Sequence, residues 1–202
     1  WKALHYAARR FFAPLLLSIE DKPTSQDVFI TNETRLPWKG SVRWSLETLD
    51  GKVLDSHEVE ARVAPFDVTL VCHLDFSSRL TDDLTRETVF IVELWQGGQR
   101  LTRQTAFFVP TKHLNLADPA IQANLHIAGG EIQIDLASHS LARLVECTLE
   151  GADVVFSDNY FDLPVSRTTV ITVPLPLGWT ASEVVAALKI RSIYDSFEHP
   201  AK

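Results

Sequence analysis

The sequence predicts an all-β protein: two tandem antiparallel β-sandwiches preceded by one short helix. From Pro14 onward, short segments of alternating apolar and polar residues recur about every eight to twelve residues, the spacing typical of sandwiches. Turn residues, including two glycine pairs, separate these segments. The first thirteen residues instead have the periodicity of a helix.

The expected helix carries an apolar stripe. Trp1, Leu4, Ala8 and Phe11 recur at the spacing of one helix face. Pro14 ends the helix, because proline has no amide hydrogen to donate and clashes with the preceding turn. Nothing downstream has the pattern of a helical partner, and the chain begins with Trp and contains no methionine. We therefore expect a C-terminal piece of a longer protein, whose missing part covers this stripe.

Residues 14–110 are predicted to form the first sandwich. Its candidate strands are Leu15–Glu20, Asp27–Thr31, Gly40–Thr48, Val53–Ala61, Asp67–Leu74, Thr88–Gln96 and Arg100–Val109. Asp50-Gly51 and Gly97-Gly98 lie between alternating segments and are strong hairpin signals. Seven short strands in about 100 residues fit an immunoglobulin-like sandwich.

The third and sixth of these strands predict which side chains enter the core. Val42, Trp44 and Leu46 share one face, and a Trp on the third strand of a sandwich commonly fills the core. Trp95 lies on the opposite face of its strand from the apolar residues, together with Glu93. We expect Trp95 to point away from the core, where it contacts a neighbouring domain or, alternatively, a sugar.

A linker over residues 111–118 precedes the second, smaller immunoglobulin-like sandwich, residues 119–202. Its candidate strands are Gln122–Ile127, Glu131–Ala137, Leu141–Leu149, Asp153–Phe156, Arg167–Val173 and Ala187–Tyr194. Thr180 and Glu183 have the spacing of a capping box, which predicts a single helical turn before the last strand. The two halves show no sequence repeat.

Composition excludes several classes of function. The chain has 202 residues and a formal net charge of −7, which disfavours nucleic-acid and anionic-membrane partners. No apolar segment reaches the ~18 residues needed to span a bilayer. Cys72 and Cys147 fall in different predicted sandwiches, so we expect two buried free thiols, with a disulfide as the alternative. Cytoplasmic and secreted or periplasmic locations both remain open.

No catalytic constellation, cofactor motif or metal site is predicted. The histidines lack metal-ligand spacing, and neither a glycine-rich phosphate loop nor a serine nucleophile motif occurs. Asp82, Asp83, Asp153, Asp158 and Asp162 are too scattered for a compact calcium loop, so structural or solvated roles are favoured. Residues 32–34, Asn-Glu-Thr, match the N-glycosylation acceptor pattern.

Aromatic side chains are the remaining candidates for a binding role, because sugars stack on exposed rings. Besides Trp95, the sequence singles out Asp158, Asn159, Tyr160 and Phe161, a polar and aromatic segment with the character of a bend. Two interpretations compete for this segment. The polar side chains hydrogen-bond the backbone while the rings pack inward, or the bend lies at the rim of a sugar-binding site.

Three segments of the chain resemble one known family. They are Trp1-Lys-Ala-Leu-His-Tyr-Ala-Ala-Arg-Arg-Phe-Phe-Ala-Pro14, Val109-Pro110 with Lys112-His-Leu-Asn-Leu-Ala-Asp-Pro119, and Phe156-Ser-Asp-Asn-Tyr-Phe-Asp-Leu163. In this order they are similar to the end of the catalytic barrel, the linker and the last domain of β-mannosidases of glycoside hydrolase family two. The resemblance spans essentially the whole chain.

The resemblance implies a partner and an activity. The partner is the missing N-terminal catalytic barrel of the same chain, contacted by Trp1, Leu4, Ala8 and Phe11. The parent enzyme would hydrolyse terminal β-linked mannosides with retention, and the present chain would be an inactive accessory region that needs no cofactor. A β-glucosaminidase-like parent is also plausible. Asn32-Glu33 repeats the family's acid/base dipeptide, but in a turn, where a solvated Glu33 is expected.

Two alternatives belong to other classes of function. The chain could be an autonomous pair of carbohydrate-binding modules, which would bind glycans through Trp95 or Tyr160. It could also be a tandem adhesion or scaffold array with a protein partner. Neither alternative explains the amphipathic helix ahead of the first strand, so that helix distinguishes them from the accessory region of an enzyme.

Overall fold

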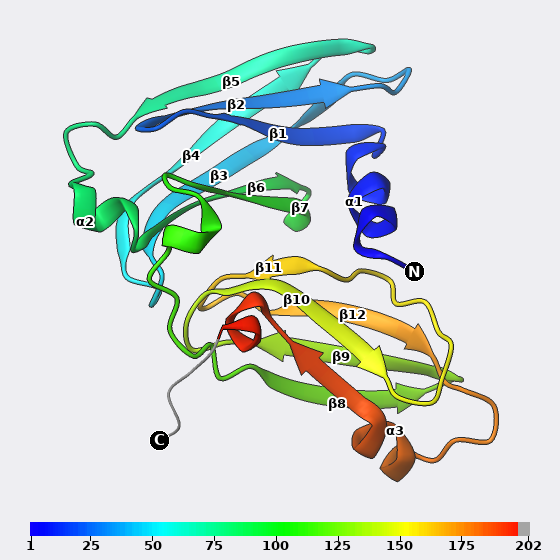
Figure 1. Ribbon diagram of the computed structural model, residues 1–202. Coiled ribbons are helices and arrows are strands. Elements are labelled where there is room, and N and C mark those ends of the chain that lie inside the picture. Colours follow the sequence, from blue (N-terminus) through cyan, green and yellow to red (C-terminus); the bar gives the residue numbers. More distant parts are fainter. Residues whose placement is uncertain (198–202) are drawn as a thin grey trace. The chain divides into compact units, whose positions relative to one another are not determined.

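The computed structural model describes residues 1–197, which form two compact units (Figure 1). Arg9–Asn115 form the first domain. The second domain consists of the chain from Leu116 onward together with Trp1–Ala8. Residues 198–202, the end of the expected second sandwich, lie outside the described residues.

The first domain is a sandwich of two antiparallel sheets, with strand orders β1-β2-β5 and β4-β3-β6-β7 (Figure 1). The strands are β1 Leu15–Asp21, β2 Ser25–Asn32, β3 Trp38–Thr48, β4 Val53–Val63, β5 Asp67–Asp75, β6 Thr88–Gln96 and β7 Gln99–Phe107. Helix α2, Asp82–Thr85, precedes β6, and the 3-10 helix η1, Thr111–His113, follows β7. The seven predicted strands are confirmed to within two residues at each end.

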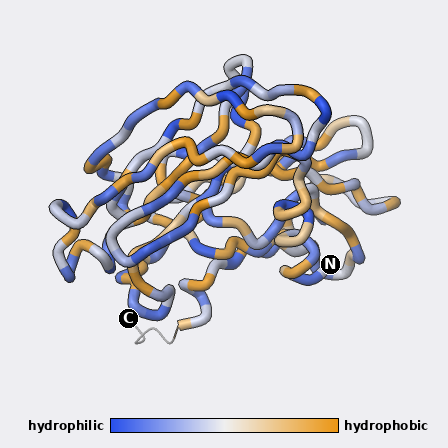
Figure 2. The backbone as a smooth tube through the Cα atoms, turned by 90° about the horizontal axis from the view of Figure 1, so that it is seen from above, coloured by the Kyte–Doolittle hydropathy of each residue, from blue (hydrophilic) through white to orange (hydrophobic). Residues whose placement is uncertain are grey.

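Alternation along the strands places the core of this domain. Hydrophobic and hydrophilic positions alternate along much of the backbone (Figure 2). Val42, Trp44 and Leu46 are all buried, as predicted. The Trp44 ring packs against the rings of Phe76 and Phe90, at centroid distances of 6.0 and 6.2 Å. Contacts of this kind add to the free energy gained by burying apolar surface.

Asn32, at the end of β2, is a structural residue. Its side chain is fully buried. The amide nitrogen donates to the carbonyl oxygens of Leu36 at 2.9 Å and Ala64 at 3.1 Å, and the amide oxygen accepts the backbone N–H and the hydroxyl of Thr34. The fold thus uses the amide of the acceptor tripeptide internally and leaves it inaccessible for glycosylation. Glu33 is exposed in the turn, as expected.

The second domain is also a sandwich, with sheet orders β12-β9-β8 and β11-β10-β13 (Figure 1). Its strands are β8 Gln122–Ala128, β9 Glu131–Ala137, β10 Ala142–Leu149, β11 Phe161–Leu163, β12 Thr169–Pro174 and β13 Leu188–Arg191. The core has its own set of buried residues, among them Ile132, Ile134 and Leu163. Helix α3, Ala181–Ala187, precedes β13, and the 3-10 helix η2, Ile193–Ser196, follows it.

Three details of the second domain differ from the sequence prediction. The strand expected over Ala187–Tyr194 ends at Arg191, and Tyr194 lies in η2. Asp153–Phe156 was expected to be a strand, but the edge strand is β11, and Phe156 is buried without regular pairing. The Thr180–Glu183 capping box is present, with both reciprocal hydrogen bonds. The helix that it starts is α3, Ala181–Ala187, longer than the single turn expected.

Helix α1, Ala3–Phe11, is anchored by a residue outside the predicted stripe. Tyr6 is buried, its hydroxyl accepts the backbone N–H of Phe156 at 3.3 Å, and its ring lies 6.0 Å from that of Tyr160. The helix therefore has a partner within the second domain, contrary to the expectation that nothing downstream would contact it. Tyr6 contacts this domain from the side of the helix that the apolar stripe does not occupy.

The predicted free thiols are confirmed: Cys72 is half-buried and Cys147 buried, and neither forms a disulfide. Burial raises the pKa of the Cys147 thiol to about 12 and that of Cys72 to about 11, because a thiolate is poorly solvated there. Both groups therefore remain protonated and unreactive near neutral pH. None of the helices in residues 1–197 is long and apolar enough to cross a membrane.

Candidate functional site

The outer face of the β3–β6 pair carries the first predicted site residue, Trp95. In the antiparallel register Ser41 lies opposite Trp95, and Arg43 lies opposite Glu93. Because side chains alternate between the two faces of a sheet, these four residues share the face that points away from the apolar core. The expectation that Trp95 is directed away from the core is therefore confirmed.

The indole of Trp95 is fixed by charged neighbours. Its Nε1–H donates to the Glu93 carboxylate at 3.2 Å, and Arg100 binds the other oxygen of that carboxylate, also at 3.2 Å. The guanidinium carbon of Arg43 lies 4.3 Å from the centroid of the indole ring, a cation–π distance. Contacts on its edge and on one face thus hold the ring in one orientation.

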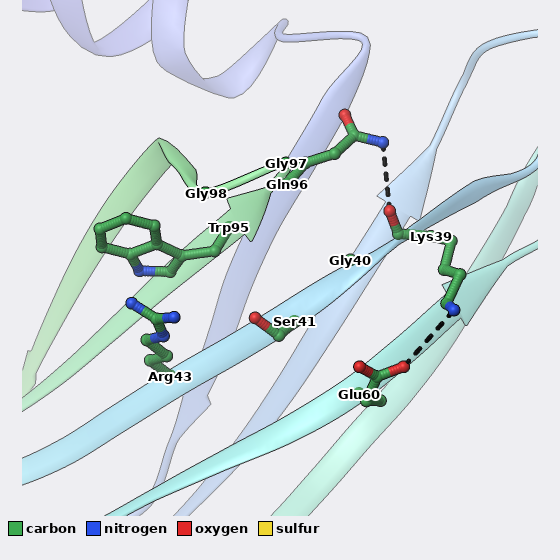
Figure 3. A pocket seen from close by; sticks show the side chains of 9 residues that line it. All are labelled: Lys39, Gly40, Ser41, Arg43, Glu60, Trp95, Gln96, Gly97 and Gly98. Atoms are coloured by element: carbon green, nitrogen blue, oxygen red, sulfur yellow. Dashed lines mark hydrogen bonds and ion pairs between the residues drawn. The ribbon is translucent and has the colours of Figure 1, made fainter.

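Beside Trp95 the surface forms a small open pocket with a volume of about 260 Å³ (Figure 3). Its lining comes from β3, β4, the end of β6 and the β6–β7 turn. The lining residues are Lys39, Gly40, Ser41, Arg43, Glu60, Trp95, Gln96, Gly97 and Gly98. Figure 3 shows Arg43 next to the indole and Lys39 with Glu60 on the far side of the bare Gly40 backbone.

Gly40 alternates with Ser41 and so shares the core face of β3 with Trp38; packing within the sandwich requires glycine here, and only its backbone lines the pocket. A Cβ atom on Gly40 would lie 2.3 Å from the carbonyl oxygen of Trp95 and 2.4 Å from the Trp38 ring, far inside contact distance. Gly97 and Gly98 form the turn after β6 with φ values of +57° and +79°, a conformation that favours glycine. The floor and the rim therefore consist of backbone that side chains do not cover.

Ion pairs surround the pocket. Lys39 Nζ lies 3.7 Å from Glu60 Oε2, and Arg43 Nε lies 3.1 Å from Glu58 Oε2. The Gln96 side chain donates to the carbonyl oxygen of Lys39 at 3.1 Å. Hydrogen bonding by the Ser41 hydroxyl, and then by Arg43, holds the pKa of the Glu58 carboxyl below its usual value.

The second predicted group, residues 158–161, has extensive structural contacts. The Asn159 side chain accepts the backbone N–H of Cys147 and donates to its carbonyl oxygen, both at 2.8 Å. Phe161 is buried in the core, and Asp158 accepts the backbone N–H of Asn159. Asn159 thus supplies to β10 the donor and acceptor that a neighbouring strand would provide.

Tyr160 combines an unusual backbone with a strong hydrogen bond. Its φ is +54°, its backbone N–H donates to the Val145 carbonyl at 2.7 Å, and its hydroxyl donates to Glu146 at 2.6 Å. The Glu146 carboxylate raises the pKa of the Tyr160 hydroxyl to about 12, since ionisation would break this bond and oppose two like charges. A role of residues 158–161 in sugar contact stays a prediction.

Metal ligation and the barrel contacts are the remaining expectations. No three or more His, Cys, Asp or Glu side chains within residues 1–197 form a group that could hold a metal ion. In the helix stripe, Trp1, Leu4 and Phe11 are 61, 76 and 63% exposed, and Ala8 is half-buried. Leu4 and Phe11 are therefore exposed on α1, whereas Trp1 precedes the helix and its ring lies 5.5 and 5.7 Å from those of His5 and Tyr6.

Sequence reasoning identified Trp95 but missed its pocket partners. Lys39, Ser41 and Arg43 alternate with the apolar residues of β3, and Glu60 lies between Val59 and Ala61 on β4. This alternation is the signal that places all four on the outer face. Their proximity to Trp95 depends on strand order and register.

Comparison with known families matches both domains in succession. Residues 24–113 match the model of the Mannosidase Ig/CBM-like domain, and residues 116–196 match that of the mannosidase Ig-fold domain. The chain is a pair of mannosidase-type immunoglobulin-like domains. The Trp95 pocket lies within the first of these mannosidase-type domains.

Solved structures with the same fold belong to longer chains. The β-D-mannosidase of Dictyoglomus thermophilum matches with a TM-score of 0.81 and 22% identity over 93% of this chain and 22% of that chain. The exo-chitosanase of Amycolatopsis orientalis matches with a TM-score of 0.67 and 17% identity over 93% of this chain and 26% of that chain. This mannosidase-type pair therefore spans about a fifth to a quarter of these structures. No curated protein matches the sequence.

Proposed function

We propose that this chain is the non-catalytic accessory region of a β-mannosidase-like exo-glycosidase. A catalytic barrel in the same parent chain would hydrolyse terminal β-linked mannose with retention, and the two sandwiches would buttress that barrel. The observation that carries this proposal is the succession of two mannosidase-type domains, in a chain that matches a β-D-mannosidase over 93% of its length.

The exposed face of α1 supports a contact with the barrel. Leu4 and Phe11 on α1 are large apolar side chains in water, as is Trp1 just before the helix, and exposed apolar side chains of this kind commonly mark an interface. Tyr6 holds α1 against the second domain, so the helix presents this surface from an ordered support.

The chemistry of the proposed parent belongs in the barrel. Retaining glycosidases use two carboxyl groups about 5–5.5 Å apart, one as nucleophile and one as acid/base. Glu33, which shares the family's Asn-Glu dipeptide, is exposed in the turn after β2, where solvent surrounds its carboxylate. We therefore assign no catalytic role to the accessory domains and expect the barrel to provide both carboxylates.

Hydrolysis of an aryl β-mannoside by the isolated chain and by the full-length parent, at equal concentrations, tests the proposal. We expect the parent to hydrolyse the mannoside and the chain to show no rate above the uncatalysed reaction. Hydrolysis by the isolated chain would contradict the accessory assignment, and Glu33→Gln would then test whether this carboxylate acts.

An aryl β-glucosaminide, assayed in parallel, tests the second candidate. The match to an exo-chitosanase over 93% of the chain favours this sugar as the alternative. If the parent cleaves only the glucosaminide, the accessory role stands and the mannose specificity is wrong. If it cleaves neither substrate, the assignment to an exo-glycosidase of either type fails.

A further inference from the structure

We infer that the pocket beside Trp95 is a binding site for one neutral sugar ring, a hexopyranose residue at the end of a glycan. This inference goes beyond the proposed function, because it assigns ligand binding to the first domain itself, and it does not depend on what the parent hydrolyses. The pocket lies entirely within that domain. It combines an aromatic wall, a bare floor and side chains that both donate and accept hydrogen bonds.

The charges around the pocket favour a neutral ligand over an ionic one. Three cationic side chains are each paired with a carboxylate. The pairs are Lys39 with Glu60, Arg43 with Glu58, and Arg100 with Glu93. A phosphate or an acidic peptide would have to displace Glu60 from Lys39 and Glu58 from Arg43, whereas a neutral ligand need not break either pair.

Sugar hydroxyls fit the open Lys39–Glu60 pair. The two groups are 3.7 Å apart, and their side chains are 60 and 79% exposed, so this ion pair is weak and easily rearranged. Each hydroxyl can accept a hydrogen bond from the ammonium group and donate one to the carboxylate. Ser41 and Gln96 also line the pocket and add a hydroxyl and an amide group. Charge-assisted bonds of this type are stronger than those between neutral groups.

The indole supplies the apolar part of the site. The C–H face of a pyranose ring packs on an aromatic side chain without losing its hydroxyl hydrogen bonds. Glu93 and Arg43 already hold the Trp95 ring in place, so little conformational entropy is lost when a ligand packs against it. A single sugar ring makes few contacts, so its binding site gains from a Trp95 ring that is already held in position.

The size of the pocket sets the length of the ligand. Pockets for drug-sized molecules begin at about 300 Å³, and this one has about 260 Å³. One sugar ring fits that space, whereas further residues of a glycan would extend over the open rim at Gly97 and Gly98. Neither glycine would meet another atom within 4 Å if it carried a Cβ, so the rim is unobstructed.

Titration of the 202-residue chain with methyl β-D-mannopyranoside, followed by amide and indole chemical shifts in NMR spectra, tests the inference. Methyl β-D-glucopyranoside and a methyl glucuronide serve as neutral and anionic comparison ligands. We expect saturable shifts at Ser41, Trp95, Gly97 and Gly98 with half-saturation in the millimolar range, typical of weak binding. The glucuronide should bind no more tightly than the neutral sugars.

Three variants test whether the sugar binds in the pocket or elsewhere on the surface. Trp95→Ala should weaken binding about tenfold or more, since it removes the aromatic wall, and Glu60→Gln should weaken it about threefold, since a charged acceptor is lost. Glu60 is highly exposed, so this second variant keeps the fold. Lys189→Ala is the matched control: Lys189 and Glu150 form an exposed pair of the same length, 3.7 Å, in the second domain.

Several outcomes would overturn the inference. They are shifts that fail to saturate, shifts that map outside the pocket, equal binding by Trp95→Ala in a folded chain, and tighter binding of the glucuronide. None of them bears on the accessory role, which the hydrolysis assays decide. Conversely, a parent inactive toward both aryl glycosides would leave the sugar site of the isolated chain intact.

Discussion

At the scale of single residues, polar side chains in the second domain replace missing backbone partners. Asn159 bonds both backbone groups of Cys147. Asp162 accepts the N–H of Leu144, a residue with φ of +51° in the irregular part of β10, and also contacts Arg143 at 3.3 Å. Buried backbone groups need partners, so these side chains explain why a polar segment occupies the edge of this sheet.

Tyr160 gives this local structure a measurable pH dependence. We expect Tyr160→Phe to lower the free energy of unfolding by roughly 1 kcal/mol near neutral pH, because a partly exposed hydrogen bond to a charged group is lost. The pKa of the hydroxyl is about 12 in the folded chain and about 10 when unfolded. The difference in unfolding free energy between the wild-type chain and Tyr160→Phe should therefore have its full value below pH 10. It should disappear as the pH rises toward 12.

Urea unfolding of both proteins between pH 7 and pH 11 measures this difference, and other alkaline titrations cancel because both proteins share them. Glu146→Gln removes the carboxylate that accepts the bond, so in that background Tyr160→Phe should show a much smaller pH dependence. A difference that stays constant through pH 11 would mean that the folded chain does not raise the pKa of Tyr160.

At the scale of elements, α1 has one side in contact with the second domain and one exposed side. Tyr6 contacts the second domain, whereas Leu4 and Phe11 remain exposed. Arg9 and Arg10 lie in the last turn, where positive charge interacts favourably with the helix dipole. A helix of nine residues is marginal in isolation, so the Tyr6 contact accounts for its order and the exposed side is available for a partner.

If the exposed side of α1 contacts the barrel, a substitution there should affect stability in the full-length parent but not in the isolated chain. Leu4→Glu should destabilise the parent by roughly 2–3 kcal/mol, because burial of a leucine against the barrel is lost, and the melting temperature should fall. In the 202-residue chain the same change should have little effect, since Leu4 is already 76% exposed. Leu177, fully exposed in the second domain, provides the control Leu177→Glu.

Calorimetry on the four variant proteins decides the matter. A parent whose melting temperature is unchanged by Leu4→Glu would mean that this face of α1 does not contact the barrel. An equal loss in the parent and in the isolated chain would mean that Leu4 stabilises the helix itself, and a loss with Leu177→Glu would indicate a general effect of added charge.

The strands show which parts of the fold the sequence pattern predicts. Alternation along β3, together with glycine-containing turns at residues 50–51 and 97–98, predicted the strands of the first sandwich to within two residues at each end. In the second domain, Val154 and Phe156 alternate like a strand, yet hydrogen bonds between Ser157 and Thr172 and around Asn159 replace regular pairing. Alternation of apolar and polar residues indicates which side chains are buried, but it does not indicate which strand the backbone pairs with.

The candidate site depends on register, which is why only part of it was predictable. Trp95 stood out because it shares a face of β6 with Glu93, opposite Phe90, Val92 and Leu94. Glu60 lies opposite Ser41 through a register shift between Leu46 and Glu47; a regular hairpin would place Val59 there. The Tyr6 contact was missed for a similar reason, since its partner Phe156 is distant in sequence and has no helical pattern.

At the scale of the whole molecule, the two domains have separate hydrophobic cores that share no residue. Leu46 is fully buried in the first core and Ile134 in the second. Leu46→Ala and Ile134→Ala should each cost about 2–5 kcal/mol, from lost burial and the cavity left behind. Because each core closes within its own unit, we expect each substitution to destabilise one domain and leave the other near its original stability.

Native-state hydrogen exchange, resolved on peptides from residues 9–115 and 116–197, measures the two stabilities separately. Leu46→Ala should accelerate exchange in β3 and β6 while β9 and β12 remain protected, and Ile134→Ala should do the reverse. Faster exchange in both sets of strands for either variant would show that the domains unfold as one cooperative unit. In that case the accessory region would resist unfolding as a single block, and a defect in either core would weaken its support of the barrel equally.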